Sequence, residues 1–310
     1  GGANAGHTVV IDGQKFILHL IPAGSLHPGT ENMIGNGVVF DPEAFFDELD
    51  ELVAAGIDAA GRIVISSRAT LVMPYHKMLD EAAETLRGNA SLGTTKRGIG
   101  PCYADKAARN GLRAGDLLDR DYFAERLSAA LTEKNALLTK LYGMEPLDSQ
   151  AVLDRYMDYG RRLAPMIDDT MERLHAHREA GKRIVFEGAQ GSLLDVDHGT
   201  FPFVTSSSAS VLGMTAGSGT PPHLLGKVVG VLKAYTTRVG EGPFPTELHC
   251  DQGRELQNIG NEFGATTGRP RRCGWLDLVA TGYVHRLNGF HAIALTKLDV
   301  LSTCETIKVC

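Results

Sequence analysis

The pattern of apolar and polar residues predicts a β-hairpin near the start of the chain. Thr8–Ile11 and Gln14–Ile21 are rich in apolar residues and flank the pair Asp12-Gly13. An Asp-Gly pair readily takes the positive φ angles of a two-residue turn, so the two segments are expected to pair as antiparallel strands.

A helix and a strand are predicted next. Apolar residues recur at helical spacing after an aspartate that suits the cap position and a proline that suits the first helical position. The short apolar run Ile63–Ile65 predicts the strand that follows. The residues that mark the helix are Asp41, Pro42, Phe45, Leu49, Leu52 and Val53, with Gly56 as its stop.

The same alternation recurs in the second half of the chain. It predicts an α/β fold with a large, mainly parallel sheet flanked by helices. No repeat or low-complexity linker marks a boundary, so we expect residues 1–310 to form a single domain. The later elements expected are a helix over residues 166–179 that ends at Gly181, strands at Ile184–Phe186, Val228–Leu232 (buried), Ile293–Leu295 and Glu305–Cys310, and a helix from Trp275 to about Leu287.

Composition narrows the class of protein. Apolar residues make up 43% of the 310 residues and charged residues 22%, and the formal net charge is −6. A nucleic-acid binder needs a broad basic face, and a membrane-spanning helix needs about 18 consecutive apolar residues, so we expect neither a nucleic-acid partner nor a membrane. The 36 glycines exceed the roughly 7% background and suggest backbone that approaches a ligand closely.

The cysteines and the chain ends add two expectations. Five cysteines, odd in number, far apart and without a Cys-x-x-Cys pair, indicate neither a disulfide framework nor a zinc site, and a reducing, cytoplasmic setting is expected. The chain opens with Gly1-Gly2 in place of methionine and stops within a predicted strand. We therefore expect an internal piece of a longer protein.

The segment Thr296–Asp299 after a predicted strand suits recognition of guanine. Guanine presents two parallel donors, N1–H and the N2 amino group, and one carboxylate offers two acceptors in matching geometry. Asp299 therefore suits guanine better than adenine, and the aliphatic stem of Lys297 suits a cover for the base. The alternative is a strand-end aspartate that caps the next turn.

A glycine-rich segment surrounds His7 near the start of the chain. Small residues on both sides leave its imidazole accessible and allow the backbone to approach phosphate or base. A histidine in this setting is suited to donating a proton to an oxygen that gains negative charge. The alternative is a histidine packed at the start of the hairpin.

Two loops have the composition of anion sites. Residues 93–109 combine hydroxyls, glycines and four cations, which suits phosphate. Residues 264–272 place arginines after two threonines, which suits a small dianion such as a dicarboxylate or a phosphate. A solvated basic loop is the alternative for each.

Two polar clusters receive little weight. His175 and His177 are two residues apart in a predicted helix, so they share no face and make a poor metal pair. Asp195, Asp197 and His198 have the types of cation ligands, but a polar loop is the simpler interpretation.

Taken together, these segments closely resemble the adenylosuccinate synthetase family over the whole chain. Residues 98–109, Gly-Ile-Gly-Pro-x-Tyr-x-x-Lys-x-x-Arg, look like one of its two signature patterns. Pro270 and Cys273 stand in a stretch that is often richer in arginine and threonine in the family. The other matching blocks, in the family's order, are Asn4–Thr8, Phe186–Gly191, Gly242–Glu247, Gly264–Arg269 and Thr296–Asp299.

The resemblance implies a GTP-dependent ligase that joins IMP to L-aspartate and releases GDP and phosphate in purine and AMP biosynthesis. In this family O6 of IMP first takes the γ-phosphoryl group, and the aspartate amine then displaces phosphate from C6. The resemblance also implies Mg²⁺ as cofactor, a homodimer, and a large sheet like that of P-loop GTP-binding proteins.

The resemblance implies a role for individual residues. His7 matches the general acid, Lys106 is a second catalytic candidate, Arg109 matches the arginine that reaches IMP in the dimer partner, and the backbone carbonyl of Gly6 matches a ligand of Mg²⁺. The positions that match IMP contacts are Asn4, Ala5, Gly6, His7, Thr95, Arg109, Gln190, Thr205 and Arg269. Those that match aspartate contacts are Ala265, Thr266, Thr267, Gly268, Arg269 and Arg271, and those that match GTP contacts are Arg271, Lys297, Leu298 and Asp299.

A rival interpretation starts from the family's other signature, a Gly-Asp-Glu-Gly-Lys-Gly phosphate loop that would precede Gly1 and carries the general-base aspartate. Without it we expect the 310 residues alone not to turn over substrate, and a catalytically inactive purine-nucleotide-binding module is the alternative to the ligase. A GTPase-type switch would explain Thr296–Asp299 but not Gly264–Arg272.

Overall fold

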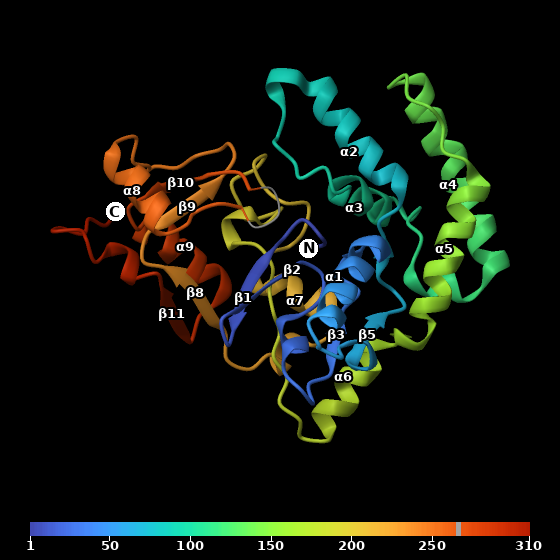
Figure 1. The fold of residues 1–310 in the computed structure, drawn as a ribbon, viewed down its shortest axis with the longest axis horizontal. Coiled ribbons are helices and arrows are strands. Elements are labelled where there is room, and N and C mark those ends of the chain that lie inside the picture. Colours follow the sequence, from blue (N-terminus) through green and yellow to red (C-terminus); the bar gives the residue numbers. More distant parts are fainter. Residues whose placement is uncertain (265–267) are drawn as a thin grey trace. The chain divides into compact units, whose positions relative to one another are not determined.

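Figure 1 shows the protein in a computed structural model, which describes residues 1–264 and 268–310. The described residues gather into two compact units. The first comprises Gly1–Ala189 with Ala216–Gly219, and the second comprises Gln190–Thr215 with Thr220–Cys310. Both units combine helices and strands, which confirms the predicted α/β class. The single domain expected for residues 1–310 stays a prediction.

The first unit holds most of the helices of the described chain (Figure 1). Its helices are α1 (Pro42–Ala54), α2 (Pro74–Arg87), α3 (Ile99–Ala108), α4 (Arg120–Lys140), α5 (Ser149–Leu163) and α6 (Thr170–Glu179). Its strands are β1 (His7–Ile11), β2 (Gln14–Leu18), β3 (Asn32–Ile34), β4 (Val39–Phe40), β5 (Ile63–Ser66), β6 (Thr70–Leu71) and β7 (Ile167–Asp168).

The second unit is built around two pairs of strands. Its strands are β8 (Val229–Lys233), β9 (Thr236–Val239), β10 (Arg271–Gly274) and β11 (Ala292–Thr296). Its helices are α8 (Asp251–Ile259) and α9 (Leu278–Asn288), and α7 (Val211–Ser218) begins in this unit.

Parallel pairing dominates where helices separate the strands. In the first unit β3, β5 and β7 form a parallel sheet in that order, and β4 pairs in parallel with β6. In the second unit β8 and β11 run parallel, with Ala292 opposite Val229. Antiparallel pairing joins β1 to β2 and β9 to β10. The parallel strands thus occur in several short ladders of the described chain.

The predicted hairpin and first helix are confirmed. Asp12 and Gly13 have φ angles of 50° and 80° between β1 and β2. Helix α1 begins at Pro42, directly after Asp41, and Gly56 follows it with a φ of 81°. Asp41 stands at the cap position, but its side chain makes no cap hydrogen bond and lies 2.8 Å from the Lys77 ammonium instead. The strand β5 then covers the predicted segment Ile63–Ile65.

Five other expectations need correction. The helix predicted over 166–179 begins only at Thr170, because Asp169 caps it from its side chain and β7 pairs with β5 before it. Ile184–Phe186 forms no strand, since no described segment pairs with it, and the Val185 side chain is 90% exposed.

The remaining corrections lie in the second unit. Glu305–Cys310 forms only a single bridge, between Leu276 and Val309, and the helix predicted from Trp275 begins at Leu278. The segment Val228–Leu232 does form a strand, but it is not buried: Val231 is 78% exposed. The run of apolar residues therefore predicted the strand correctly, but it did not predict whether other elements bury that strand.

The larger core lies in the first unit, where α1, α2, α4 and α5 bury aromatic and aliphatic side chains. Phe40, Phe45, Ile65, Tyr75 and Phe123 have no exposed surface. Burial of each such side chain contributes about 1.5–3 kcal/mol, so these contacts define the unit. The smaller core of the second unit consists of Ala234, Tyr235, Leu256, Cys273, Trp275, Val300 and Leu301.

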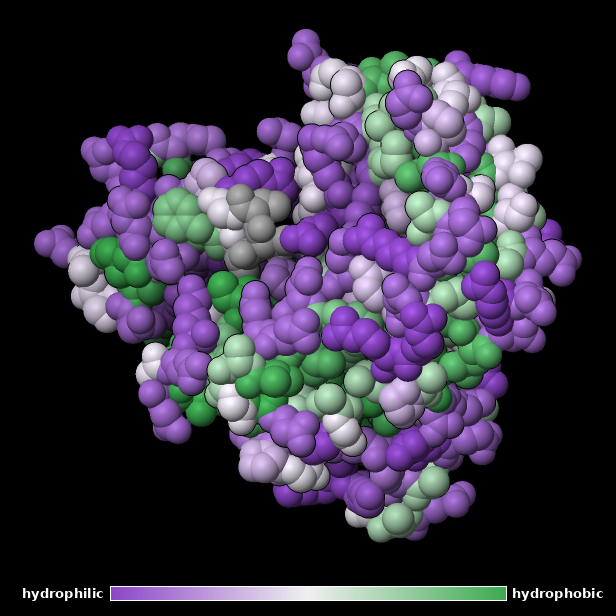
Figure 2. Space-filling model, turned by 45° about the vertical axis from the view of Figure 1, so that its right-hand side comes forward, coloured by the Kyte–Doolittle hydropathy of each residue, from purple (hydrophilic) through white to green (hydrophobic). Residues whose placement is uncertain are grey.

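Hydrophilic residues cover most of the face seen in Figure 2. Large apolar side chains are nevertheless exposed on both strands of the β8–β11 pair, among them Val229 and Ile293. Among the helices in the part of the chain that the structure describes, none is long and apolar enough to cross a membrane.

Candidate active site

His7 is the first residue of β1 and lies opposite Leu18 in the hairpin. Its imidazole Nε2 is 3.4 Å from Oε1 of Glu187. The other oxygen of Glu187 accepts a hydrogen bond of 3.0 Å from the backbone N–H of Ala23, so this carboxylate connects the histidine to the loop after β2. Nε2 of His7 is buried and makes no hydrogen bond within the described residues, so the accessible imidazole expected from the small neighbours of His7 is only partly present: the ring is about one-third exposed, and this nitrogen is not.

The segment before His7 forms a tight turn. The backbone N–H of Ala5 donates to the carbonyl of Gly2 over 3.4 Å, and Ala3 is buried. Asn4 and Ala5 are half-buried, and Gly6 is exposed. The turn therefore anchors the segment through its small residues and leaves the Gly6 backbone at the surface of the unit.

One face of α2 carries three buried polar side chains at every fourth residue: His76, Asp80 and Glu84. Residues four apart lie above one another on a helix, so the three form a single polar stripe. We call them the α2 stripe. Each of them is bonded to the segment that contains residues 92–109.

The two acidic members of the α2 stripe hold the loop that contains Thr95. The carboxylate of Glu84 accepts from the backbone N–H groups of Leu92, Gly93 and Thr94. Asp80 accepts from the Thr94 hydroxyl and from the Gly98 backbone N–H, each at 2.9 Å. Backbone hydrogen bonds from Thr94, Leu92 and Gly93 outweigh burial and lower the pKa of Glu84, so the carboxylate stays charged.

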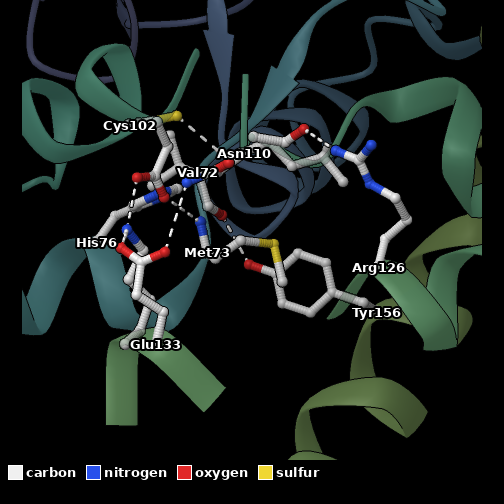
Figure 3. A network of polar contacts seen from close by, with 12 residues as sticks. Val72, Met73, His76, Cys102, Asn110, Arg126, Glu133 and Tyr156 are labelled. Carbon is white, nitrogen blue, oxygen red and sulfur yellow. Dashed lines mark hydrogen bonds and ion pairs between the residues drawn. The ribbon is translucent and has the colours of Figure 1, made fainter. Parts of the chain in front are cut away.

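His76 connects the stripe to α3 (Figure 3). Its Nδ1 accepts from the Met73 backbone N–H, so its Nε2 carries the proton and donates to Asp105 Oδ2 over 3.0 Å. The other Asp105 oxygen accepts from the Lys134 ammonium at 2.6 Å. Burial opposes the charge of Asp105, but the bonds from His76 and Lys134 outweigh it and lower the pKa of Asp105. Burial also lowers the pKa of His76.

Asp105 is followed in α3 by Lys106, and α3 ends at Arg109. The Lys106 ammonium donates to the backbone carbonyl of Asn36 over 2.8 Å, and burial lowers the pKa of Lys106. Arg109 is exposed and has a φ of 67°, a left-handed conformation that ends the helix. The buried network of Asp105 therefore fixes the helix from which both predicted cations project.

In the second unit, two neighbouring arginines of β10 point to different carboxylates. Arg271 donates from Nη1 to Glu262 over 2.6 Å, and Arg272 donates from Nε to Glu247 over 2.8 Å and from Nη2 to its other oxygen. Arg272 also donates from Nη1 to the carbonyls of Gly240 and Gly242, over 3.1 and 3.0 Å. Successive residues of a strand point to opposite faces, so the two arginines have different surroundings.

Glu262 has no exposed surface and binds three donors. It accepts from Arg271, from the Lys233 ammonium at 2.8 Å and from the Tyr235 hydroxyl at 2.6 Å. Burial opposes its charge, but the bonds from Lys233, Tyr235 and Arg271 outweigh burial and lower the pKa of Glu262. Burial lowers the pKa of Lys233, and its bond to Glu262 offsets this only in part.

The segment predicted to recognise guanine begins at Thr296, the last residue of β11. Lys297 has a φ of 62°, and its ammonium donates to the Gly260 backbone carbonyl over 2.8 Å. Leu298 and Asp299 are exposed. The residue at the cap position of the short turn Asp299–Leu301 is Leu298, and Asp299 is the first residue of the turn itself, so Asp299 does not stand where a capping aspartate would.

The other predicted residues lie in the second unit. Gln190 has a φ of 59°, and the Thr205 hydroxyl lies 3.4 Å from that of Ser207. The Arg269 backbone carbonyl accepts from Gly264, and Gly268, with a φ of 65°, donates to the Gly264 carbonyl. The predicted aspartate contacts Ala265, Thr266 and Thr267 lie outside the described residues.

The clusters that received little weight have structural roles. Asp195 is fully buried and accepts from the backbone N–H groups of Asp197, His198 and Ser210, as an aspartate that organises a polar loop does. His177 pairs with Glu31 at 2.8 Å. Within the described residues, no group of three or more His, Cys, Asp or Glu side chains has the arrangement of a metal site.

Sequence reasoning missed several residues that hold the candidate site together. The spacing of the α2 stripe was visible in the sequence, but nothing local indicated what the stripe binds. Glu187 belonged to a matching block without a role of its own, and Glu262 lies nine residues from Arg271 with no motif around it. Only the folded chain brings these carboxylates to their cations.

Comparisons with known proteins identify the family. The profile of the adenylosuccinate synthetase family matches residues 1–310. The adenylosuccinate synthetases of Saccharophagus degradans and Heliobacterium modesticaldum are each 54% identical over 310 residues, which is the whole of this chain and 72% of each relative. The chain belongs to the adenylosuccinate synthetase family.

Solved structures support the same conclusion. Fully ligated adenylosuccinate synthetase from Plasmodium falciparum superposes with a TM-score of 0.93 at 40% identity, covering 100% of this chain and 72% of that one. A succinoaminodeoxyadenylate synthetase of cyanophage S-2L matches with a TM-score of 0.61 at 22% identity over 94% of this chain and 73% of that one, a likeness of fold alone. The protein is therefore a ligase of purine biosynthesis that joins IMP to L-aspartate with the use of GTP.

Proposed function

We propose that the residues singled out above divide the work of this ligase between the two units. In the first unit His7 acts as the general acid, Lys106 assists it, and Asn4, Ala5, Gly6, Thr95 and Arg109 contact IMP. In the second unit Gln190, Thr205 and Arg269 contact IMP as well. Residues 265–269 and Arg271 receive aspartate, and Arg271, Lys297, Leu298 and Asp299 receive GTP. The observation that carries the proposal is the agreement of the whole chain with one family.

The chemistry proceeds in two steps. The general base, which the family's phosphate loop would supply ahead of Gly1, takes the proton from N1 of IMP. The γ-phosphoryl group then moves from GTP to O6, and GDP leaves. The aspartate amine then attacks C6, the C6–O6 bond breaks, and phosphate leaves with its bonding electrons while the amine loses a proton. The first step is needed because a carbonyl oxygen leaves poorly and a phosphate leaves well. Phosphoryl transfer depends on position and charge, which cations such as Lys106 and Arg271 supply.

His7 suits the acid in this scheme because its Nε2 makes no hydrogen bond within the described part of the chain, although it lies within 3.4 Å of Glu187. A proton held there can be donated to an oxygen that gains charge, either O6 of IMP or an oxygen of the γ-phosphate. General acids of this kind typically contribute about 10²–10⁴ to a rate.

Mg²⁺ is the cofactor that the family implies, and the backbone carbonyl of Gly6 is the ligand that we assign to it. Gly6 is exposed, and its carbonyl is the hard oxygen donor that Mg²⁺ prefers. A cage of protein side chains is not required, because Mg²⁺ in nucleotide sites takes many of its oxygens from phosphates and water. When bound, the ion neutralises charge on the phosphates. The residues therefore fit such a cofactor, with Gly6 as its contact.

A homodimer in which Arg109 reaches the partner's IMP is the finer part of the proposal. The exposed position of Arg109 at the left-handed end of α3 supports it, because an exposed side chain is accessible to a second copy of the chain. The cytoplasmic setting stays a prediction. Sedimentation of the full-length protein tests the homodimer, and a dimer is the expected result. An Arg109→Leu variant tests the contact with the partner's IMP and is expected to raise the KM for IMP.

The decisive experiment is a coupled assay for adenylosuccinate with the full-length protein. Activity is expected only when GTP, IMP, L-aspartate and Mg²⁺ are all present, and omission of any one should abolish it. If nucleotides bind but no product forms under any condition, the alternative of an inactive purine-nucleotide-binding module is correct.

A further inference from the structure

Glu262 holds Arg271 at two points. The Arg271 guanidinium donates from Nη1 to Glu262 Oε2 over 2.6 Å, and the Arg271 backbone N–H donates to the Glu262 carbonyl over 2.9 Å. The Gln257 side chain donates to the Arg271 carbonyl over 2.7 Å. Both the backbone and the charged end of Arg271 are therefore fixed from α8 and the segment that follows it.

The carboxylate that anchors Arg271 is itself immobilised. Glu262 is fully buried, and its oxygens are occupied by Lys233 and Tyr235 as well as by Arg271. A Cβ at Gly260 would lie 2.2 Å from the Tyr235 hydroxyl, so only glycine at position 260 allows that hydroxyl to reach Glu262. A buried carboxylate with fixed donors on both oxygens cannot swing away, because leaving them would cost the full penalty of an unpaired buried charge.

The neighbouring Arg272 shows what an arginine with only a structural role looks like. Its Nε and Nη2 bind Glu247, and its Nη1 binds two backbone carbonyls. A guanidinium has five N–H donors, and only one of the donors of Arg271 is engaged within the described residues. Arg271 is therefore anchored but still able to present a fork of donors to a carboxylate.

The charge around Glu262 also favours an anionic ligand. Lys233 and Arg271 share one carboxylate, which leaves one excess positive charge. Lys297 is close enough for its charge to contribute to lowering the pKa of Lys233. An anion that binds beside Lys233, Arg271 and Glu262 therefore meets a positive electrostatic potential. This potential is already in place, because no side chain has to move to create it.

We propose that Glu262 is a positioning residue for the substrate aspartate, which acts by fixing the Arg271 guanidinium in the orientation that receives the substrate carboxylate. This inference rests on the aspartate-binding role proposed for Arg271. It adds that the affinity for aspartate is set in part by a buried side chain that never touches the substrate.

The test is a double-mutant cycle of Glu262→Gln and Arg271→Leu in the full-length enzyme, with the KM of each substrate and kcat measured. Glu262→Gln is expected to raise the KM for aspartate about 10-fold or more, because it removes a charge-assisted hydrogen bond from the anchor. The KM for IMP should change by less than about two-fold. Combined with Arg271→Leu, it should add nothing to the aspartate KM of Arg271→Leu alone.

Tyr235→Phe is the matched control, because it removes one hydrogen bond from Glu262 and leaves the bond to Arg271 in place. It should leave the aspartate KM within about three-fold. Thermal unfolding of each variant measures the loss of stability. If Glu262→Gln fails to fold, Glu262→Asp keeps the charge but places it one methylene further from Arg271. The same rise in the aspartate KM, with the IMP KM unchanged, is then expected.

The outcomes separate the aspartate-binding role of Arg271 from the positioning role of Glu262. If Arg271→Leu leaves the aspartate KM unchanged, the proposed role of Arg271 is wrong. If Arg271→Leu raises it and neither Glu262 variant does, Arg271 binds aspartate without help from Glu262, and the positioning role is refuted. Equal losses for all substrates, or additive effects in the double variant, would mean that Glu262 only stabilises the fold.

Discussion

Gly98 faces the backbone of His76 so closely that a Cβ at position 98 would lie 2.8 Å from the His76 carbonyl carbon. The φ of Gly98 is 73°, a conformation that residues with a side chain rarely adopt. At the same point its backbone N–H donates to Asp80. The start of α3 is therefore locked to α2 by a contact that only glycine allows.

Replacement of this glycine should destabilise the protein. Gly98→Ala combines a strained backbone with a steric overlap and is expected to lower the free energy of unfolding by about 2–5 kcal/mol. Gly143 is the matched control, since it has a φ of 64° but open space around its Cα. Gly143→Ala should cost only about 1 kcal/mol. Denaturant unfolding of both variants measures the difference, and equal losses would contradict the contact with His76.

His7→Asn should impair turnover more than binding. Loss of a general acid is expected to lower kcat about 10²-fold or more, while the KM for IMP changes far less. His27, which is exposed and belongs to no proposed site, provides the control variant His27→Asn with normal kinetics. Near-normal turnover by His7→Asn would remove His7 from catalysis.

Base selection should change with Asp299. Asp299→Asn replaces one acceptor with a donor that faces the donors of guanine, so use of GTP should fall. Xanthosine triphosphate presents an oxygen where guanine presents its N2 amino group, so the use of xanthosine triphosphate as a substrate should increase. The ratio of kcat/KM for GTP to kcat/KM for xanthosine triphosphate measures this change of preference. A variant with the full preference for GTP would show that Thr296–Asp299 does not bind the base.

Acid should weaken the fold through His76. Burial lowers the pKa of His76 in the folded state, so the unfolded chain takes up a proton near pH 6.5 that the folded chain resists. Stability is then lost as the pH falls from 7 to 5. The lowered pKa of Asp105 acts in the same direction, but only as the pH falls below its ordinary value of 3.8.

The measurement is the melting temperature against pH for the wild type and for His76→Gln, which keeps polar atoms near Met73 and Asp105 but cannot titrate. The variant should have a lower melting temperature than the wild type at pH 7. Its melting temperature should fall by less than that of the wild type when the pH is lowered to 5. Parallel curves for the two proteins would show that His76 does not cause the loss.

Local signals in the sequence predicted the elements that depend on local chemistry. The Asp12-Gly13 turn formed as expected, and α1 begins at Pro42 as expected, although the Asp41 side chain lies beside Lys77 and makes no cap hydrogen bond. Ile184–Phe186 has the same apolar content as a true strand, but a strand exists only when another segment pairs with it. The pairing of β7 with β5, which shortened the predicted helix after residue 166, joins residues about one hundred positions apart and leaves no local trace.

The sequence by itself determined the family, the reaction and the types of chemical groups, because these depend on the order of short motifs along the chain. Only the tertiary structure decided which arginine and lysine side chains are paired, and with which carboxylates. Arg271 and Arg272 are adjacent in the sequence, yet strand geometry sends them to Glu262 and Glu247, nine and 25 residues away. A charge buried on folding needs a partner in space, and its position along the chain does not identify that partner.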